Sequence, residues 1–375
     1  MNLNRNPRIV IIGGGFAGMM AIRSLNRRMA AAGARGDIHL IDAGPGHALI
    51  PEIPHVLERG LDMHSRILDF SALLPDTEMQ LHQGRVCGVD RQHRQVLRVH
   101  EEPIGYDYAL LAVGTEAAFP NVPGLHAHAW PVRTAADAIH VTTMLRRQPT
   151  SRVVIAGGGF TGVELAGSLR THHVILLEQR DSLLPNMDPT YGRYASKVLH
   201  SLGVDVRLSE KLMRVDASTV YTDSDEFRYN LLIWAGGIKP PHWIQQSGIP
   251  CDRRGYPMAS AWGQIDEHLF VAGDLWPLRQ FSGNVPVQTA EASTAMGDFV
   301  GRVMAARILG TRVPPAFQHR ARGMIVSLGL RRGVGWLFMP SMPLHGVLAG
   351  KLKRAALYRY RQEIGHRRNQ KHCMF

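Results

Sequence analysis

A short apolar run that leads directly into three glycines constrains this chain more than any other feature. Residues 8–12 are rich in isoleucine and valine, three glycines follow, and an apolar helical pattern begins behind them. This order is typical of a strand, a tight turn and a helix. We expect Gly13 to permit the turn, Gly15 to let a pyrophosphate approach the backbone, and Gly18 to let the helix pack close to the strand.

The segment that follows supplies the acid that such a site needs. Residues 38–42 predict a second strand that ends in Asp42, whose carboxylate can accept a hydrogen bond from a ribose hydroxyl. The phosphates would lie at the N-terminus of the first helix, where unpaired N–H groups and the helix dipole favour negative charge. Taken alone, such a glycine run also fits a strand-to-helix turn that binds nothing.

The whole pattern occurs a second time. Residues 152–156 form another apolar run, residues 174–178 predict a strand that ends in Glu178, and between them the glycines recur at the same spacing: Gly157, Gly159 and Gly162. Each unit also has a later apolar strand that ends in glycine, at Gly114 and at Gly236. Two complete units are hard to explain as chance turns, so the sequence predicts two dinucleotide sites.

Composition sets the limits of the remaining possibilities. The chain has 375 residues, 45% of them hydrophobic, which suits two nucleotide domains and a modest extra segment. The formal net charge is +12, and residues 351–371 carry eight Lys or Arg against one acid, so part of the excess is C-terminal. This charge is compatible with nucleic acid, an anionic membrane surface or anionic cofactors. No nucleic-acid-binding motif accompanies it, so we do not expect that partner.

Cysteines and apolar runs exclude several classes. Cys87, Cys251 and Cys373 lie far apart without a Cys-x-x-Cys pair, so neither a redox-active disulfide nor a metal site is indicated. The first strand begins too early to leave room for a signal peptide. No apolar run reaches the roughly 18 residues that a membrane span needs.

Between the motifs the sequence predicts simpler elements. The two prolines in residues 48–55 suggest a fixed loop. Residues 76–109 contain short strands, at 78–82, 84–89 and 95–99, which we interpret as a β-meander insertion. A helix is expected from about 287 to 309, and a basic and apolar segment follows Pro315.

By these motifs the chain resembles the two-dinucleotide flavoproteins, the FAD- and pyridine-nucleotide-dependent oxidoreductases. Within them it is most similar to the single-subunit type II NADH:quinone oxidoreductases, over residues 1–340. The resemblance implies an α/β fold with two Rossmann-like dinucleotide-binding domains, the FAD domain split by the NADH domain, together with β-meander insertions and a C-terminal amphipathic tail. The predicted limits are 1–116 and 241–316 for the two parts of the FAD domain, 117–240 for the NADH domain, and 317–375 for a membrane-associating segment.

The resemblance also implies a role for each motif. FAD would be bound by three parts of the chain. The first unit contributes Gly13, Gly15, Phe16, Ala17, Gly18 and Asp42, an inner motif contributes Ala112, Gly114 and Thr115, and a terminal motif contributes Gly273 and Asp274. NADH would be bound by the second unit: Gly157, Gly159, Gly162, Glu178 and Gly236. Glu178 should accept hydrogen bonds from the adenosine ribose and repel a 2′-phosphate, which favours NADH over NADPH.

Two residues are predicted to be catalytic by the same resemblance. Glu164, one turn into the second nucleotide helix, matches a glutamate that lies near the flavin and the nicotinamide. Gln288 matches a glutamine near the flavin ring and the quinone. The related proteins tend to carry a second glutamine four residues later, where this chain has Ala292.

The function implied is that of a flavoprotein that passes hydride from NADH to FAD and then electrons to a quinone-like acceptor. The apolar and basic tail from Met324 is typical of a peripheral anchor on an anionic membrane surface, on the cytoplasmic side of the cell membrane. Because both nucleotide sites lie before it, truncation after Pro315 should leave NADH-to-flavin transfer intact. A homodimer is one option for the oligomeric state.

Three other functions stay open at this point. A reductase that donates electrons to a small redox protein needs the same nucleotide sites and a basic docking face, but no membrane tail. A sulfide:quinone oxidoreductase needs cysteines at the flavin, and the three present do not match that pattern. A flavin-binding regulatory protein would transfer hydride slowly and turn over no acceptor.

Overall fold

The first domain is built on a five-stranded parallel sheet with the order β20-β9-β1-β2-β5. The computed structural model describes residues 6–74, 77–148, 150–277, 288–319, 321–339 and 341–364. The strands of this sheet are β1 (Arg8–Ile12), β2 (Asp37–Asp42), β5 (Met79–Gln83), β9 (Tyr108–Leu111) and β20 (Leu269–Val271). In β1, β2, β9 and β20 the isoleucines, leucines and valines are buried on both faces, as the strands of a covered parallel sheet require, whereas Leu81 of the edge strand β5 is 46% exposed.

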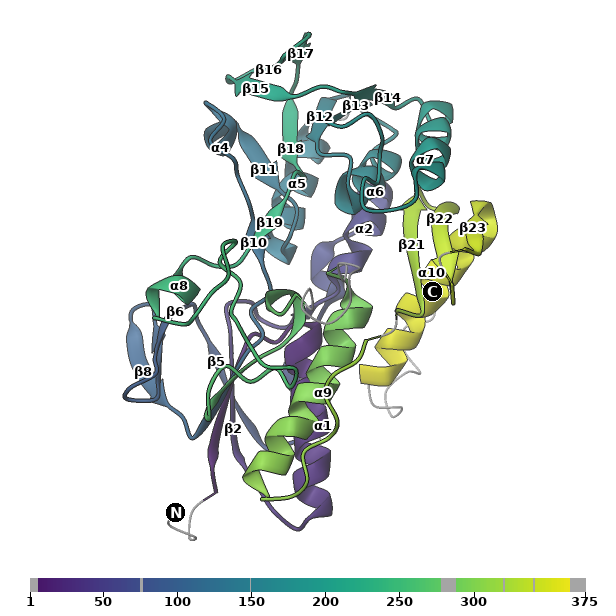
Figure 1. Ribbon diagram of the computed structural model, residues 1–375. Coiled ribbons are helices and arrows are strands. Elements are labelled where there is room, and N and C mark those ends of the chain that lie inside the picture. The colour runs from purple at the N-terminus through teal and green to yellow at the C-terminus, as the bar shows by residue number, and fades with distance from the viewer. Residues whose placement is uncertain are drawn as a thin grey trace.

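Two long helices cover one face of this sheet. The helices α1 (Phe16–Ala31) and α9 (Ala290–Ile308) run side by side, as Figure 1 shows. Glycines permit this close approach, since a Cβ atom at Gly297 would lie 2.1 Å from the Ala17 carbonyl oxygen. The helix predicted from residue 287 begins at Ala290, where the Thr289 side chain accepts a hydrogen bond from the Ala292 N–H. Val287 lies outside the described residues.

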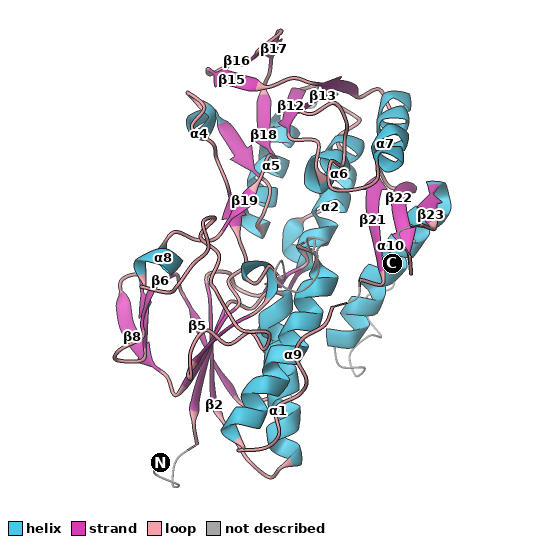
Figure 2. Cartoon of the chain, in the orientation of Figure 1, coloured by secondary structure: helices cyan, strands magenta, loops and turns pink. Residues whose placement is uncertain are grey.

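A β-meander lies on the side of the sheet opposite the two helices (Figure 2). Its strands are β6 (Val86–Asp90), β7 (Gln95–Arg98) and β8 (Glu101–Gly105), and Val89, Val96 and Ile104 join the core of the first domain. The predicted meander strand at 78–82 was assigned to the wrong sheet. It is β5, which pairs in parallel with β2. An edge strand is exposed on one side, and this gives it the mixed polarity of a meander strand.

The second domain repeats the first with its own parallel sheet, in the order β11-β18-β12-β13-β14. The strands are β11 (Ala129–Pro131), β12 (Arg152–Ala156), β13 (His173–Glu178), β14 (Asp205–Leu208) and β18 (Leu231–Trp234). The helices are α5 (Ala135–Arg147), α6 (Phe160–Ser168) and α7 (Pro189–Ser201), and the antiparallel strands are β15 (Leu212–Val215), β16 (Thr219–Thr222) and β17 (Glu226–Arg228). The prediction of an α/β fold with two Rossmann-like sheets and antiparallel insertions is confirmed.

The chain crosses between the two domains twice, and the crossings pair with each other. The strands β10 (Glu116–Ala117) and β19 (Ile238–Lys239) are antiparallel neighbours, and the Ala118 N–H donates to the Gly237 carbonyl at 3.0 Å. The strands of the second sheet therefore lie between the two crossings in sequence. The predicted domain limits at 116 and 240 remain predictions that agree with this arrangement.

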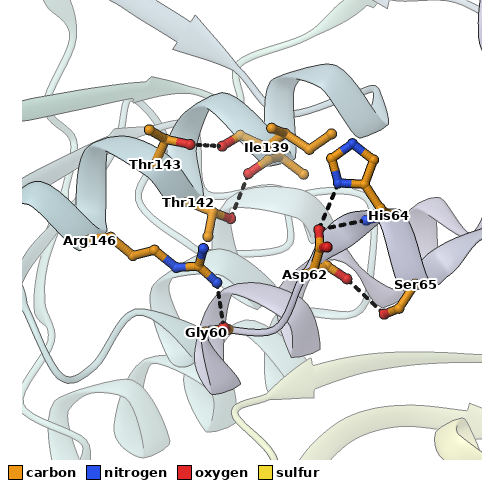
Figure 3. A network of polar contacts seen from close by, with 9 residues as sticks. Gly60, Asp62, His64, Ser65, Ile139, Thr142, Thr143 and Arg146 are labelled. Carbon is orange, nitrogen blue, oxygen red and sulfur yellow. Dashed lines mark hydrogen bonds and ion pairs between the residues drawn. The ribbon is translucent and has the colours of Figure 1, made fainter.

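The segment predicted as a loop at 48–55 is mostly helical. It forms η1 (Ile50–Glu52) and α2 (Ile53–Arg59), with a proline in the first turn of each. Proline is tolerated there because the first helical N–H groups have no partner within the helix. Beyond α2, the Arg146 guanidinium of α5 donates to the Gly60 carbonyl at 2.7 Å, which joins the two domains (Figure 3).

Shorter elements complete the two domains. They are β3 (His47–Ala48), η2 (Met63–Arg66), β4 (Ile67–Leu68), α3 (Phe70–Leu73), α4 (Leu125–His128), α8 (Trp243–Gln246) and η3 (Gly273–Leu275). The strands β3 and β4 pair with each other just beyond the end of β2. Through this pairing His47 is held close to the first glycine loop.

The C-terminal segment is folded, where the sequence predicts only an amphipathic tail. The strands β21 (Gly323–Leu328), β22 (Arg332–Leu337) and β23 (Pro343–His345) form an antiparallel sheet beside α6 and α7. The helix α10 (Gly346–Ile364) then runs back toward α1, as Figure 1 shows. Among the described residues, no helix is long and apolar enough to cross a membrane.

Candidate functional site

The first glycine loop combines two crowded positions with one open position. Gly13 has a φ of +101°, and a Cβ atom there would lie 2.5 Å from the Ala112 carbonyl oxygen. A Cβ atom at Gly18 would lie 1.9 Å from the Gly13 carbonyl oxygen. Around Gly15, by contrast, the same added atom meets nothing within 4 Å. The loop therefore brings Gly13, Gly18 and Ala112 together and leaves room at Gly15, at the N-terminus of α1.

The second loop reproduces this geometry. Gly157 has a φ of +119°, and its added Cβ atom would lie 2.8 Å from the Gly236 nitrogen. The Cβ atom of a substituted Gly162 would lie 1.8 Å from the Gly157 carbonyl oxygen, and Gly159 again faces open space. Ala235 and Gly236 thus lie against the second loop as Ala112 and Val113 lie against the first. Each loop is a cradle that a diphosphate can enter at a helix N-terminus.

The two predicted acids hold equivalent positions. Asp42 accepts hydrogen bonds from the Gly14 N–H at 2.6 Å and the Gly44 N–H at 2.7 Å. Burial raises the pKa of the Asp42 carboxyl, and these two backbone donors oppose that rise. Glu178 accepts from the Gly158 N–H at 2.6 Å and the Arg180 N–H at 2.9 Å. Backbone donors therefore fix the Asp42 carboxylate beside Gly14 and the Glu178 carboxylate beside Gly158.

The inner and terminal motifs meet through an arginine that the sequence did not reveal. Arg133 Nη2 lies 2.7 Å from Thr115 Oγ1 and 3.2 Å from Asp274 Oδ2. The Ser293 hydroxyl donates to Asp274 Oδ1 at 3.0 Å. Gly114 precedes Thr115 with a φ of +67° and an open Cβ position. Arg133 lies outside every glycine motif, and no local pattern marks it.

Phe16, Ala17 and Gly273 lie where α1 begins. The added Cβ atom of a substituted Gly273 would lie 2.9 Å from Ala17 Cβ, so Ala17 packs against the terminal motif. The Phe16 ring points to the other side, with its centroid 5.1 Å from that of the His47 ring. The first cradle thus contacts the terminal motif on one side and the β3 strand on the other.

Gln288, predicted to be catalytic, has its amide engaged in the structure. Its Nε2 atom lies 2.8 Å from the Asp274 carbonyl oxygen and 3.2 Å from the Tyr256 hydroxyl. Ala292, at the position of the expected second glutamine, is 2% exposed. The side chain therefore links the start of α9 to the terminal motif, and its catalytic role stays a prediction.

Glu164, the other predicted catalytic residue, faces the C-terminal unit, by which we mean β21, β22, β23 and α10. It forms an ion pair with Lys353 of α10 and accepts a hydrogen bond from the Ser327 N–H at 2.8 Å. His55 of α2 lies nearby, and its pKa is lowered by burial and then by the Lys353 charge. The sequence did not predict that Lys353 pairs with Glu164, because 189 residues separate the two.

These residues fit an FAD molecule and a pyridine nucleotide. The open space at Gly15 can take a pyrophosphate, Asp42 can accept from a ribose, and the group of Thr115, Arg133 and Asp274 offers donors and an acceptor for the ribityl chain. The open space at Gly159 and the carboxylate of Glu178 likewise fit a second dinucleotide. Backbone N–H groups suit a pyrophosphate and carboxylates suit ribose hydroxyls, so the kinds of group present match these ligands.

Residues 7–297 match the model of the pyridine nucleotide-disulphide oxidoreductase family, and the chain belongs to that family. The predicted family is therefore confirmed, and the protein is an oxidoreductase of the kind that uses FAD and NAD(P)H. Cys87 and Cys251 are free thiols, and the sequence has no Cys-x-x-Cys pair, so the disulphide in the family name has no counterpart motif here.

The chain is also similar to individual proteins over most of its length. The chain is 26% identical to the NADH dehydrogenase-like protein YutJ of Bacillus subtilis, over 96% of this chain and 99% of that protein. It is 21% identical to the type II NADH:quinone oxidoreductase of Staphylococcus haemolyticus, over 88% and 90% of the two chains. The structure of NDH2 from Plasmodium falciparum in complex with NADH superimposes with a TM-score of 0.82 at 16% identity, over 95% of each chain, and shows the same fold.

Proposed function

We propose that this protein oxidises NADH through a bound FAD and passes the electrons to a quinone at a membrane surface. The observation that carries the proposal is the duplicated cradle, in which two open glycines, Gly15 and Gly159, each lie close to an acid that is fixed by backbone N–H donors. When bound, FAD accepts hydride from NADH and releases electrons to a second acceptor. The type II NADH:quinone oxidoreductase among the relatives supports the quinone as that acceptor.

The residues around the first cradle bind and orient FAD in this proposal. The N-terminus of α1 and the Gly15 backbone hold the pyrophosphate, and Asp42 holds the adenosine ribose. Asp274, kept in place by Arg133 and Ser293, accepts from the ribityl hydroxyls. The N-terminus of α9 adds partial positive charge beside the terminal motif and would favour negative charge on a ring system bound there.

The second cradle selects the nicotinamide nucleotide. Glu178 is 6% exposed and is fixed by two backbone donors, so it cannot turn away from the ribose. A 2′-phosphate would meet this carboxylate at close range, which favours NADH. Arg180 is exposed and lies two residues further on, so it weakens this preference without reversing it.

Glu164 and Lys353 are the polar pair that we assign to proton handling. Their ion pair places a carboxylate and an ammonium beside the second cradle, within the C-terminal unit's contact with α6. The ammonium carries N–H donors and the carboxylate oxygens are acceptors, so the contact holds both kinds of group that a proton relay needs. Reduction of a quinone consumes protons as well as electrons, and in this proposal one of them passes through the pair.

The C-terminal unit exposes apolar side chains at two places, which we together call the apolar tip. These places are the turn after β22 and the start of α10, and the side chains are 48–68% exposed: Phe338, Met339, Met342, Val347 and Leu348. Exposed basic residues accompany it on the same unit: Arg322, Arg331, Arg332 and Lys351. An apolar surface with cationic neighbours fits the boundary of an anionic lipid layer.

Two basic residues of α10 that would be natural partners of lipid are engaged elsewhere. Lys353 pairs with Glu164, and Arg361 lies 2.8 Å from the Glu52 carboxylate. The proposed membrane contact therefore relies on the apolar tip and on the exposed basic residues named with it. The side of α10 that carries Lys353 and Arg361 faces the rest of the protein.

An acceptor experiment tests the proposal. Protein reduced by NADH without oxygen is mixed in a stopped-flow instrument with a soluble quinone analogue, with a small iron–sulfur redox protein, or with oxygen. We expect the quinone to reoxidise the flavin fastest, and anionic vesicles carrying a lipid-soluble quinone to accelerate it further. Faster reoxidation by the redox protein would contradict the quinone and assign the alternative, a reductase of such a protein.

A further inference from the structure

We propose that the C-terminal helix completes the FAD site: Tyr360 of α10, acting through His47, positions the glycine loop that holds the FAD pyrophosphate. This inference rests on the proposed binding of FAD in the first cradle. It concerns a positioning role, because neither side chain needs to touch the cofactor. The evidence is a chain of hydrogen bonds that leads from α10 to the Gly14 carbonyl.

His47 is the centre of this chain. It is 1% exposed, its Nδ1 atom lies 2.8 Å from the Gly14 carbonyl oxygen, and its Nε2 atom lies 3.0 Å from the Tyr360 hydroxyl. Burial lowers the pKa of His47, so the ring is neutral and carries a single N–H. A carbonyl oxygen can only accept, so Nδ1 is the donor to Gly14. Nε2 is then the acceptor, and the Tyr360 hydroxyl donates to it.

The two peptide groups on either side of the Gly14 Cα atom are both held as a result. The Gly14 N–H donates to Asp42, and the Gly14 carbonyl accepts from His47. A trans peptide is planar, and its C=O and N–H groups point in opposite directions. The hydrogen bond from His47 to the Gly14 carbonyl therefore turns the N–H of Gly15 away from His47. Gly15 is the open position of the first cradle, where the pyrophosphate needs backbone donors.

Ring contacts reinforce the hydrogen bonds. The Tyr360 ring packs against Phe16, the first residue of α1, with ring centroids 4.6 Å apart and planes 35° from parallel. Tyr360 is partly buried against the core of the first domain. A substitution that keeps the ring but removes the hydroxyl therefore separates the hydrogen bond from the packing.

Two ion pairs hold α10 in place, one next to Tyr360 and one two turns earlier on the helix. Arg361, next to Tyr360, pairs with Glu52, which also pairs with Arg66 at 2.9 Å. Two turns earlier on the same helix, Lys353 pairs with Glu164 of the second domain. The helix thus connects the two cradles, and its position reaches the first cradle through Tyr360.

This arrangement changes the expectation for a truncated chain. The sequence alone suggests that truncation after Pro315 leaves NADH-to-flavin transfer intact, because both glycine loops lie earlier. The truncated chain would lack Tyr360, so His47 would lose its hydrogen-bond donor and would become exposed to solvent. By linkage, FAD binding should in turn stabilise the docked position of α10.

The test compares Tyr360→Phe and Tyr360→Ala with a matched pair on the same helix, Tyr358→Phe and Tyr358→Ala. Tyr358 is 63% exposed and lies two residues away. FAD affinity is measured by titrating each full-length apoprotein with FAD, and the rate of FAD release is measured from each holoprotein. Phosphorus NMR of the bound cofactor reports on the pyrophosphate, and the visible absorption spectrum reports on the flavin ring.

We expect Tyr360→Phe to weaken FAD binding about 3- to 10-fold, as the loss of one neutral hydrogen bond does, and Tyr360→Ala to weaken it further. The pyrophosphate signals should shift in both Tyr360 variants while the visible spectrum stays the same. The Tyr358 variants should match the wild type. The thermal unfolding temperature of apo Tyr360→Phe should fall by only a few degrees, as the loss of one hydrogen bond does, so the variant stays folded at the temperature of the FAD titration and positioning is separated from general unfolding.

Two results would overturn the inference. Tyr360 variants that bind FAD as tightly as the wild type, with unshifted pyrophosphate signals, would show that α10 does not position the loop. Tighter binding by Tyr360→Ala would show that α10 obstructs the cradle. Failure of the wild-type protein to bind FAD is a different result, since it would contradict the proposed function itself.

Discussion

Replacing Gly15 by valine should remove FAD while leaving the fold intact. Gly15 has φ −72° and ψ −167°, an extended conformation that valine accepts. An added Cβ atom meets nothing within 4 Å there. We therefore expect the unfolding free energy of the apoprotein to change by about 1 kcal/mol or less, mainly because valine is a poor helix N-cap.

The loss of FAD affinity should be far larger. The valine side chain would occupy the space in which the pyrophosphate approaches the backbone. A hydrogen bond to a charged group contributes about 1.5–3 kcal/mol, so the loss of two such bonds weakens binding by about 3–6 kcal/mol. This corresponds to a factor on the order of 10² to 10⁴ in Kd.

The duplicated cradle supplies a matched control. Gly159 has φ −73° and ψ −170° and the same open surroundings. Gly159→Val should therefore keep FAD and lose reduction by NADH, while dithionite still reduces the flavin. Gly18→Val differs from both, because its Cβ atom would lie 1.9 Å from the Gly13 carbonyl oxygen. That backbone clash should destabilise the apoprotein by about 1–3 kcal/mol or more.

The assays are FAD titration, urea unfolding of the apoproteins, and the bleaching of flavin absorbance by NADH. The reasoning fails if Gly15→Val binds FAD with wild-type affinity. It also fails if Gly159→Val loses FAD as readily as Gly15→Val does, since the two cradles would then not be separate sites.

Further predictions concern the nucleotide, the arginine, pH and the membrane. Glu178→Gln should narrow the preference for NADH over NADPH by about 1–3 kcal/mol in kcat/KM, and a wild-type preference for NADPH would refute the role of this carboxylate. Arg133→Lys should weaken FAD binding about 10-fold in a titration, because one ammonium cannot replace the forked guanidinium. Burial depresses the pKa of His47 below 6.5, so the unfolded chain takes up the proton first. Apoprotein stability should therefore fall as the pH drops below about 6.5, and His47→Gln should show a weaker dependence in urea unfolding at several pH values. Phe338→Ser should reduce flotation with anionic vesicles, whereas Met258→Ser, at a residue that is 50% exposed in the first domain, should not.

Local patterns allowed the sequence to predict the cradles. Each glycine role depends on neighbours within a few residues, so Gly13, Gly18 and their counterparts could be read from spacing alone. The acids at the ends of β2 and β13 follow the same rule. The repetition also revealed the later apolar strands that end at Gly114 and Gly236, but not that these strands contact the glycine loops.

Contacts between distant segments could not be predicted in the same way. Arg133, His47 and Tyr360 carry no spacing signal, because their partners are 141, 33 and 313 residues away. Glu164 was found as a member of its helix, but its pairing with Lys353 depends on how the C-terminal unit docks. Such polar contacts are specified by the assembled fold and by no local segment.

Some errors arose from ambiguous local patterns. The prolines in η1 and α2 suggested a loop, although proline is also favoured at the first turn of a helix. The strand β5 was assigned to the meander because an edge strand of a parallel sheet shares the mixed polarity of an antiparallel one.

An anaerobic titration of the purified protein with NADH tests the central claim most directly. The protein should carry FAD, and one equivalent of NADH should bleach the oxidised flavin spectrum. NADH should reduce the flavin faster than an equal amount of NADPH does. Gly159→Val should keep the oxidised spectrum under the same titration and lose it on addition of dithionite. A wild-type protein that binds no FAD, or whose bound FAD stays oxidised in excess NADH, would contradict the account.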